Sequence, residues 1–369
     1  MAASAAITSE RIAFSRLSER VKAKIFIGAL LTATVFFYVF APLVHSVWWP
    51  FSSLQGFYSA LIYLVTLHVP LTAFIYLDRS SYRVISRHKL RFYLIAPGFL
   101  LSVFLLFVFF STNITSIFFL MFGWWSYWHY QKQHYGVYCF VKSYYDLRSS
   151  PIERFVILTA TLPAMIAIVP VVIDSNGTDL ERRIIAHYGW ALHSVGILFL
   201  LGVGVLGVSL AIGALRAADG SARRQLVPAA LLTFLAANYW PFFFFKDVSL
   251  AAAMATGGHG LQYVVFMIVY AYNGSPPSGG PPRKRAFRGA ASLVVMFALA
   301  AGLWKITEVL PAQTILGLDN AALGGALATL GVSMTGAHYL LDAVLWRLSD
   351  RNSRELVVGK YGFLFANRV

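Results

Sequence analysis

Long apolar stretches separated by short polar or charged connections dominate the chain from residue 25 onwards. A helix needs about 20 apolar residues to cross the hydrocarbon core of a bilayer. Ten stretches come close to this length and predict spanning helices at 25–45, 57–77, 92–110, 113–130, 155–173, 189–214, 226–245, 249–272, 290–304 and 321–346. We therefore expect an all-α, multi-pass membrane bundle.

Polar segments define the expected boundaries of this bundle. Residues 1–24 predict a basic cytoplasmic N-terminal tail, residues 25–346 the transmembrane domain, and residues 347–369 a basic cytoplasmic C-terminal tail. A stretch rich in proline, glycine and serine predicts a linker near 273–288, before the final pair of spans. The beginning of the chain is too polar and basic for a cleavable signal peptide.

Basic residues gather on one side of the expected bundle. When the termini and every second connection are assigned to one face, that face receives 26 of the 30 lysines and arginines, and the other receives four. Cytoplasmic loops of membrane proteins carry such an excess, so we expect both termini in the cytoplasm and a bacterial inner-membrane location. The net charge of +15 then reflects orientation and attraction to anionic membrane lipids, and it implies no nucleic-acid partner.

The composition supports the membrane assignment and narrows the chemistry. Hydrophobic residues make up 58% of the chain and charged residues only 12%, about half the charged share of a soluble domain. This composition excludes a disordered protein, a coiled coil and an ordinary soluble enzyme. The single cysteine, Cys139, excludes an internal disulfide, a cysteine-based zinc site and an iron–sulfur cluster.

Ionisable residues at the expected membrane depth are the candidate functional groups, because such groups are costly there and mark function by default. Asp342 is the only acidic residue that the predicted spans enclose. Five of the nine histidines fall in the same, cytoplasmic half of the bilayer, on four different helices. The predicted metal ligands are His68, His129, His134, His259, His338 and Asp342.

The spacing of these residues shapes the prediction. His338 and Asp342 are four residues apart and share one helix face. His129 and His134 are five apart, which is about 140° around an ideal helix, so they meet at one centre only if the helix kinks or ends there. Three glycines surround His259 and permit the close approach of a neighbouring helix.

Imidazole nitrogens combined with a carboxylate suit iron, zinc or copper. We expect one or two non-haem iron ions that activate oxygen against a lipid or isoprenoid substrate; zinc and haem b fit the pattern less well. Asp342, Tyr339 and Gln262 are the candidate catalytic residues, and Gln133 is a further hydrogen-bond donor beside the metal. Alternatively, Asp342 would pair with Arg347 or Lys132 and have a purely structural role.

The placement of histidines such as His129, His134 and His338 at the cytoplasmic side of a helical bundle resembles that of histidine-rich multi-pass membrane oxygenases. These include lipid desaturases and hydroxylases and bacterial carotene-cleaving dioxygenases. The resemblance covers the architecture and no aligned stretch. It implies a membrane-bound iron oxidoreductase, which would need a separate electron-donor protein as a hydroxylase or desaturase but not as a dioxygenase.

Other functions stay open at the level of the sequence. A metal-free lipid acyltransferase would use His338 as a general base oriented by Asp342. A haem-b electron carrier would need histidines on facing helices, for which His68 and His338 would serve. A transporter would use the same ionisable groups as a proton relay.

Overall fold

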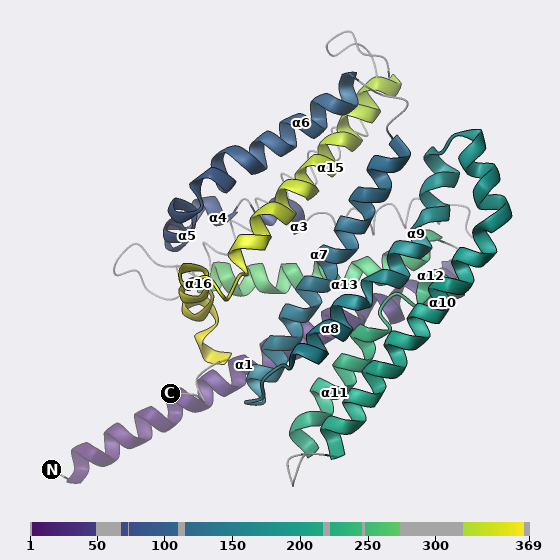
Figure 1. Cartoon of the computed structure of the whole chain (residues 1–369). Coiled ribbons are helices and arrows are strands. Elements are labelled where there is room, and N and C mark those ends of the chain that lie inside the picture. The colour runs from purple at the N-terminus through teal and green to yellow at the C-terminus, as the bar shows by residue number, and fades with distance from the viewer. Residues whose placement is uncertain are drawn as a thin grey trace.

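The computed structural model describes residues 2–48, 68–72, 74–109, 115–216, 222–245, 248–273 and 320–364. These residues form an all-α structure (Figure 1), which confirms the predicted fold class. Its α-helices are α1 (Ala2–Trp48), α3 (His68–Leu71), α4 (Phe74–Leu77), α5 (Tyr82–Arg87), α6 (Ala96–Phe109), α7 (Thr115–Tyr144), α8 (Pro151–Thr159), α9 (Thr161–Asn176), α10 (Asp179–Arg216), α11 (Ala222–Ala236), α12 (Pro241–Phe244), α13 (Val248–Tyr272), α15 (Asn320–Leu345) and α16 (Arg351–Tyr361). Short helical turns of other types are η1 (Arg79–Ser81), η2 (Arg91–Ile95) and η3 (Gly362–Leu364).

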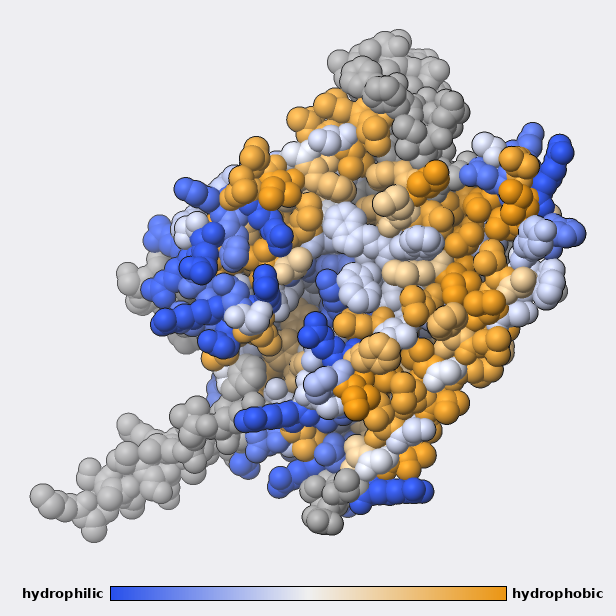
Figure 2. All heavy atoms as spheres, viewed as in Figure 1, coloured by the Kyte–Doolittle hydropathy of each residue, from blue (hydrophilic) through white to orange (hydrophobic). Residues whose placement is uncertain are grey.

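Four described segments are long and apolar enough to cross a bilayer: Glu19–Leu43, Pro151–Asp174, Asp179–Arg216 and Leu250–Tyr272. A fifth is added if Arg79–Arg87 and Arg91–Leu106, which meet at 93°, form one broken span. Figure 2 shows a broad apolar surface over α9 and α10, with hydrophilic side chains gathered towards its two ends. Long apolar helices with such a surface indicate an integral membrane protein.

Several predicted spans correspond to helices, and others cannot be compared. The stretches at 113–130 and 321–346 fall largely on helices α7 and α15, but neither helix is among the described segments long and apolar enough to cross a bilayer. The span expected at 290–304 lies outside the described residues, as do most of the span at 57–77 and most of the linker near 273–288.

The single helix expected at 226–245 is broken in the structure. Helix α11 ends at Ala236, and α12 begins at Pro241 after a turn. Proline has no N–H and suits the first turn of a helix but not its interior. The buried Asn238 lies in the turn, where its backbone carbonyl and side-chain oxygen both accept a hydrogen bond from Tyr38. The break therefore leaves these two oxygens paired inside the bundle.

Helix α1 is continuous over 47 residues, so the predicted N-terminal tail runs without interruption into the first span. At about 1.5 Å per residue, this helix is roughly 70 Å long, more than twice the ~30 Å thickness of a hydrocarbon core. A large part of α1 must therefore extend beyond any bilayer that its apolar part crosses.

Helices that are distant in sequence meet at the centre of the bundle. Helix α1 packs along α13, α15 packs along α6, and both α3 and α7 contact α13 and α15. Helices α1 and α13 approach closely at Gly258, where an added Cβ would lie 2.9 Å from the backbone oxygen of Thr34. Glycine at this position lets the two backbones touch, and it fixes the position of the following residue, His259.

The segment after the last long helix also folds onto the bundle. Helix α16 begins after the N-cap residue Asp350, and its last residue, Tyr361, is fully buried. The Tyr361 hydroxyl donates to the backbone oxygen of Phe266 in α13 at 2.8 Å. The ammonium of Lys360 forms a buried ion pair with Asp78, at 2.7 Å between Nζ and Oδ2. The predicted C-terminal tail thus contains a docked helix.

Candidate metal centre

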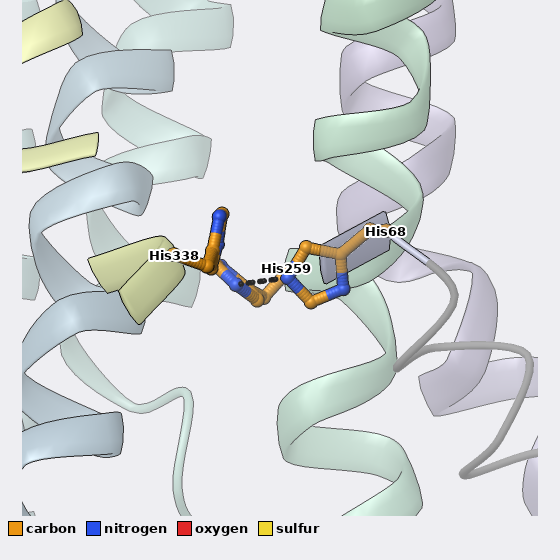
Figure 3. A group of neighbouring side chains, drawn as sticks. All are labelled: His68, His259 and His338. Atoms are coloured by element: carbon orange, nitrogen blue, oxygen red, sulfur yellow. Dashed lines mark hydrogen bonds between the residues drawn. The ribbon is translucent and has the colours of Figure 1, made fainter. Parts of the chain in front are cut away.

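Four buried histidines from four helices surround one point in the bundle. His68 in α3, His129 in α7, His259 in α13 and His338 in α15 are each at most 9% exposed. Consecutive ring centroids around the group lie 4.8 Å (His68–His259), 5.2 Å (His259–His129), 5.2 Å (His129–His338) and 5.0 Å (His338–His68) apart. Figure 3 shows the rings of His68, His259 and His338 gathered between their helices.

Asp342 brings a carboxylate to the same point. It follows His338 by one turn of α15, and its Oδ2 lies 3.6 Å from Nε2 of His338 and 3.8 Å from Nε2 of His129. Two groups of three donors result, in each of which the ligand atoms lie within 4.8 Å of one another: His68, His259 and His338, and His129, His338 and Asp342. Either group could hold a metal ion.

Ring nitrogens at this point are poorly satisfied by the protein. Nε2 of His129 and Nε2 of His338 are buried and have no hydrogen-bond partner within the described residues. The Nε2 atoms of His259 and His68 approach to 3.2 Å, a contact that needs a proton or a metal ion between them. A buried polar atom left unpaired costs about 1–3 kcal/mol. A cation at the centre would remove this cost for several nitrogens at once.

A loop of hydrogen bonds orients two of the donors from behind. The Thr72 hydroxyl lies 2.5 Å from Nδ1 of His338 and 2.8 Å from the Tyr263 hydroxyl. Tyr263 in turn donates to Oδ1 of Asp342 at 3.1 Å. The loop leaves Nε2 of His338 and Oδ2 of Asp342 directed at the centre, as the outer partners of metal ligands commonly do.

Thr72 and Tyr263 are functional candidates that the sequence analysis missed. Thr72 follows His68 by four residues, and Tyr263 follows His259 by four. In a helix this spacing places two residues on the same face. A polar residue one turn after a candidate ligand was therefore the signal that could have identified both.

Aromatic rings cover the imidazoles on one side. Tyr339, a predicted catalytic residue, stacks on His129 with ring centroids 4.1 Å apart. Its hydroxyl donates to that of Tyr130 at 3.2 Å, and the Tyr130 ring lies 4.2 Å from the ring of His259. Tyr339 and Tyr130 thus place two hydroxyl groups next to the histidines.

His134 lies outside both donor groups. Helix α7 is continuous through this region, so the five-residue spacing turns His134 away from the side of His129. Its Nδ1 instead lies 3.2 Å from Nε2 of Gln262, a predicted catalytic residue. Gln133 donates to Oε1 of Gln262 at 3.2 Å and to the backbone oxygen of His259 at 2.8 Å. These three side chains form a polar layer next to the four histidines.

Replacing Tyr263 with phenylalanine is expected to weaken metal binding by about 10–100-fold, because partners of metal ligands commonly contribute that much. The substitution removes the donor to Oδ1 of Asp342 and opens the loop through Thr72. Metal affinity measured by competition with a chromophoric chelator checks this. Tyr76→Phe is a matched control, since it removes a hydroxyl that donates to the backbone oxygen of Phe92. Equal affinities for the two variants would show that the loop does not support the centre.

The structure therefore brings together His68, His129, His259, His338 and Asp342, and it places His134 beside them. Cys139 lies ten residues after His129 in α7, roughly 15 Å further along the helix axis, where its sulfur contacts Ser149. The donors at the centre are accordingly nitrogen and oxygen atoms. Comparison with known proteins found no matching protein family, curated protein or solved structure.

Proposed function

We propose that this protein is an integral membrane metalloenzyme that holds one non-haem iron ion and oxidises a lipid or isoprenoid. The observation that carries the proposal is the meeting of four buried imidazoles and one buried carboxylate inside an apolar helical bundle. Ionisable groups at such positions are costly to keep without a function. A lipid-soluble substrate would reach the centre from the bilayer itself.

The donor set supports iron. His129, His338 and Asp342 have the composition of the two-histidine, one-carboxylate triad of non-haem iron oxygenases. Zinc sites in proteins mostly take four ligands, whereas five donors gather here. Haem b fits poorly, because the Nε2 atoms of His68 and His259 are 3.2 Å apart and the rings of His68 and His338 are 5.0 Å apart. These separations leave no room for a porphyrin between the rings.

The shared ligand supports a single ion. His338 belongs to both donor groups, and its Nδ1 is engaged by the Thr72 hydroxyl at 2.5 Å. Only the Nε2 lone pair is then available, and one lone pair binds one ion. In this proposal the donors of both groups therefore surround the same ion.

The side chains around the centre have separate roles in this proposal. Iron would activate dioxygen and so supply the oxidising power towards the lipid. The Asp342 carboxylate offsets the positive charge of the ion, and the buried setting keeps bulk water from the centre. The hydroxyls of Tyr130 and Tyr339 are 3.2 Å apart, and they hold the Tyr339 hydroxyl proton at the edge of the metal centre. An acyltransferase would use only His338 and Asp342 and would give the other three imidazoles no role.

The proposal extends to topology and partners. The distribution of 26 basic residues on one face against four on the other supports ten spans, with both termini in the cytoplasm and the centre in the cytoplasmic half of a bacterial inner membrane. Hydroxylation or desaturation would draw electrons from a separate donor protein. The G-x-G-x-x-G string at 202–207 lies inside helix α10 and not at the strand-to-helix turn where a flavin or nicotinamide cofactor binds. Cleavage of an isoprenoid by a dioxygenase would not need a donor protein.

Elemental analysis of the detergent-purified protein tests the proposal. We expect about one iron per chain, no Soret absorption, and dioxygen-dependent conversion of a lipid that accumulates in a deletion strain. A Soret band would show haem instead. An active protein without bound metal would show acyl transfer or another metal-free reaction.

A further inference from the structure

A groove on another face of α7 has the dimensions of a ligand site. It lies between α7 and the continuous segment of α8 and α9, and its volume is about 680 Å³. Sites for small molecules typically measure about 300–1,000 Å³. Trp128 and Tyr135 form its wall on α7, whereas the adjacent His129 belongs to the metal centre. The groove and the metal centre are therefore separate features of the same helix.

One end of the groove is cationic. Arg154 lines it, with its guanidinium 5.7 Å from the ring centroid of Tyr135. The ammonium of Lys132 lies 5.3 Å from the ring centroid of Trp128, which lines the groove. Neither cation pairs with a carboxylate in the part of the chain that the structure describes. An anion at this end of the groove would give both cations a partner.

The groove becomes apolar with increasing distance from this end. Ser149 and Ser150 lie at the polar end, just before the first turn of α8. From Arg154 the wall continues over Leu158, Leu162 and Met165, with Thr159 and Thr161 among them, over a helical distance of roughly 16 Å. The Thr161 hydroxyl donates to the backbone oxygen of Leu158. This order of charge, hydroxyl and hydrocarbon along the groove is the order of groups along a phospholipid.

We propose that this groove binds an anionic phospholipid. The phosphate lies at Arg154 and Lys132, and one acyl chain lies along Leu158, Leu162 and Met165. The cations select the charged headgroup, and the apolar wall selects a ligand that carries hydrocarbon. Neither Arg154 nor Lys132 belongs to a donor group of the metal centre, so this inference does not depend on the proposed function.

Native mass spectrometry of the detergent-solubilised protein, titrated with phosphatidylglycerol or phosphatidylcholine, tests the proposal. We expect one phosphatidylglycerol to bind about 30-fold more tightly than phosphatidylcholine, as expected for two basic residues near a headgroup. The double variant K132Q/R154Q loses this preference. The matched control R20Q/K24Q, which removes two exposed charges of α1, keeps it.

A second variant addresses the apolar part of the groove. Leu162→Trp fills the groove without changing its charge and is expected to weaken binding of both lipids. Inorganic phosphate at millimolar concentration should not displace the bound phosphatidylglycerol. The proposal is overturned if both lipids bind equally, if K132Q/R154Q keeps the preference, or if inorganic phosphate competes. The iron content of every variant, measured in parallel, should equal that of the wild type. A loss of lipid binding with unchanged iron then concerns the groove alone, and a loss of iron concerns the metal centre.

Discussion

Replacing His338 with alanine is expected to weaken metal binding more than replacing His68 or His129 does. Among the described residues, His338 alone belongs to both donor groups. Without it, neither group keeps three donors. Loss of His68 leaves the group of His129, His338 and Asp342 intact, and loss of His129 leaves the three-histidine group. Metal content per chain after purification, and affinity by chelator competition, measure the difference.

The control for these variants is His187→Ala. His187 is exposed on α10, so its loss should leave the metal content unchanged. Partners of metal ligands commonly contribute about 10–100-fold to metal affinity. We therefore expect His338→Ala to lower the metal affinity more than Tyr263→Phe does. If His338→Ala retained a full complement of metal, the four histidines would not form the binding site.

Replacing Lys360 with methionine is expected to destabilise the fold by about 3–5 kcal/mol, the usual cost of leaving one member of a buried ion pair alone. The ammonium of Lys360 is 2.7 Å from Oδ2 of Asp78, and both residues are buried. The double variant D78N/K360M should recover most of the loss, because it removes both charges. The unfolding free energy in mixed detergent micelles measures the effect.

An exposed ion pair on the same helix gives the control. Arg351 and Glu355 pair at 2.8 Å on the surface of α16, and exposed pairs contribute about 0–1 kcal/mol. Arg351→Met should therefore leave the unfolding free energy almost unchanged. Equal losses for Lys360→Met and Arg351→Met would mean that burial of the Lys360–Asp78 pair has no energetic consequence.

The same buried pair predicts a pH dependence. Burial acts to raise the pKa of Asp78, but hydrogen bonds from Lys360 and Ser80 outweigh it and lower the pKa below its ordinary value. Because the folded-state pKa of Asp78 is the lower one, the Asp78 carboxylate contributes its full stabilisation above the unfolded pKa of about 3.9. That stabilisation is lost as the pH falls through the lowered pKa. Burial lowers the pKa of Lys360, so the pair stays complete only up to that lowered value. The wild type should lose more stability than D78N/K360M when the pH is lowered below about 4.

Hydropathy predicted helices best where a helix is apolar along its length. The stretches at 189–214 and 249–272 lie within α10 and α13. The pattern did not predict that α1 and α7 continue into polar residues, because hydropathy reports transfer into lipid and not helical propensity. It also merged α11 with α12, since one asparagine and one proline hardly change the mean hydropathy of the stretch at 226–245. The break depends on local hydrogen bonds that an average cannot represent.

The gathering of the histidines followed from membrane depth and not from any local motif. His68 and His338 are separated by most of the chain, yet the assigned spans placed them in the same half of the bilayer. Depth alone could not separate His129 from His134, because the direction of each side chain depends on how α7 faces α13 and α15. The loop through Thr72 and Tyr263 depends on the same packing. The metal-binding role of these residues stays a prediction.

The order in which the donors are synthesised has a consequence for how the protein matures. His68, His129 and His259 leave the ribosome before α15, the helix that carries His338 and Asp342. Neither donor group is complete until α15 has entered the bundle. The ion can therefore be captured only after insertion of nearly the whole chain, and a product truncated before α15 would keep three imidazoles but could not close the site.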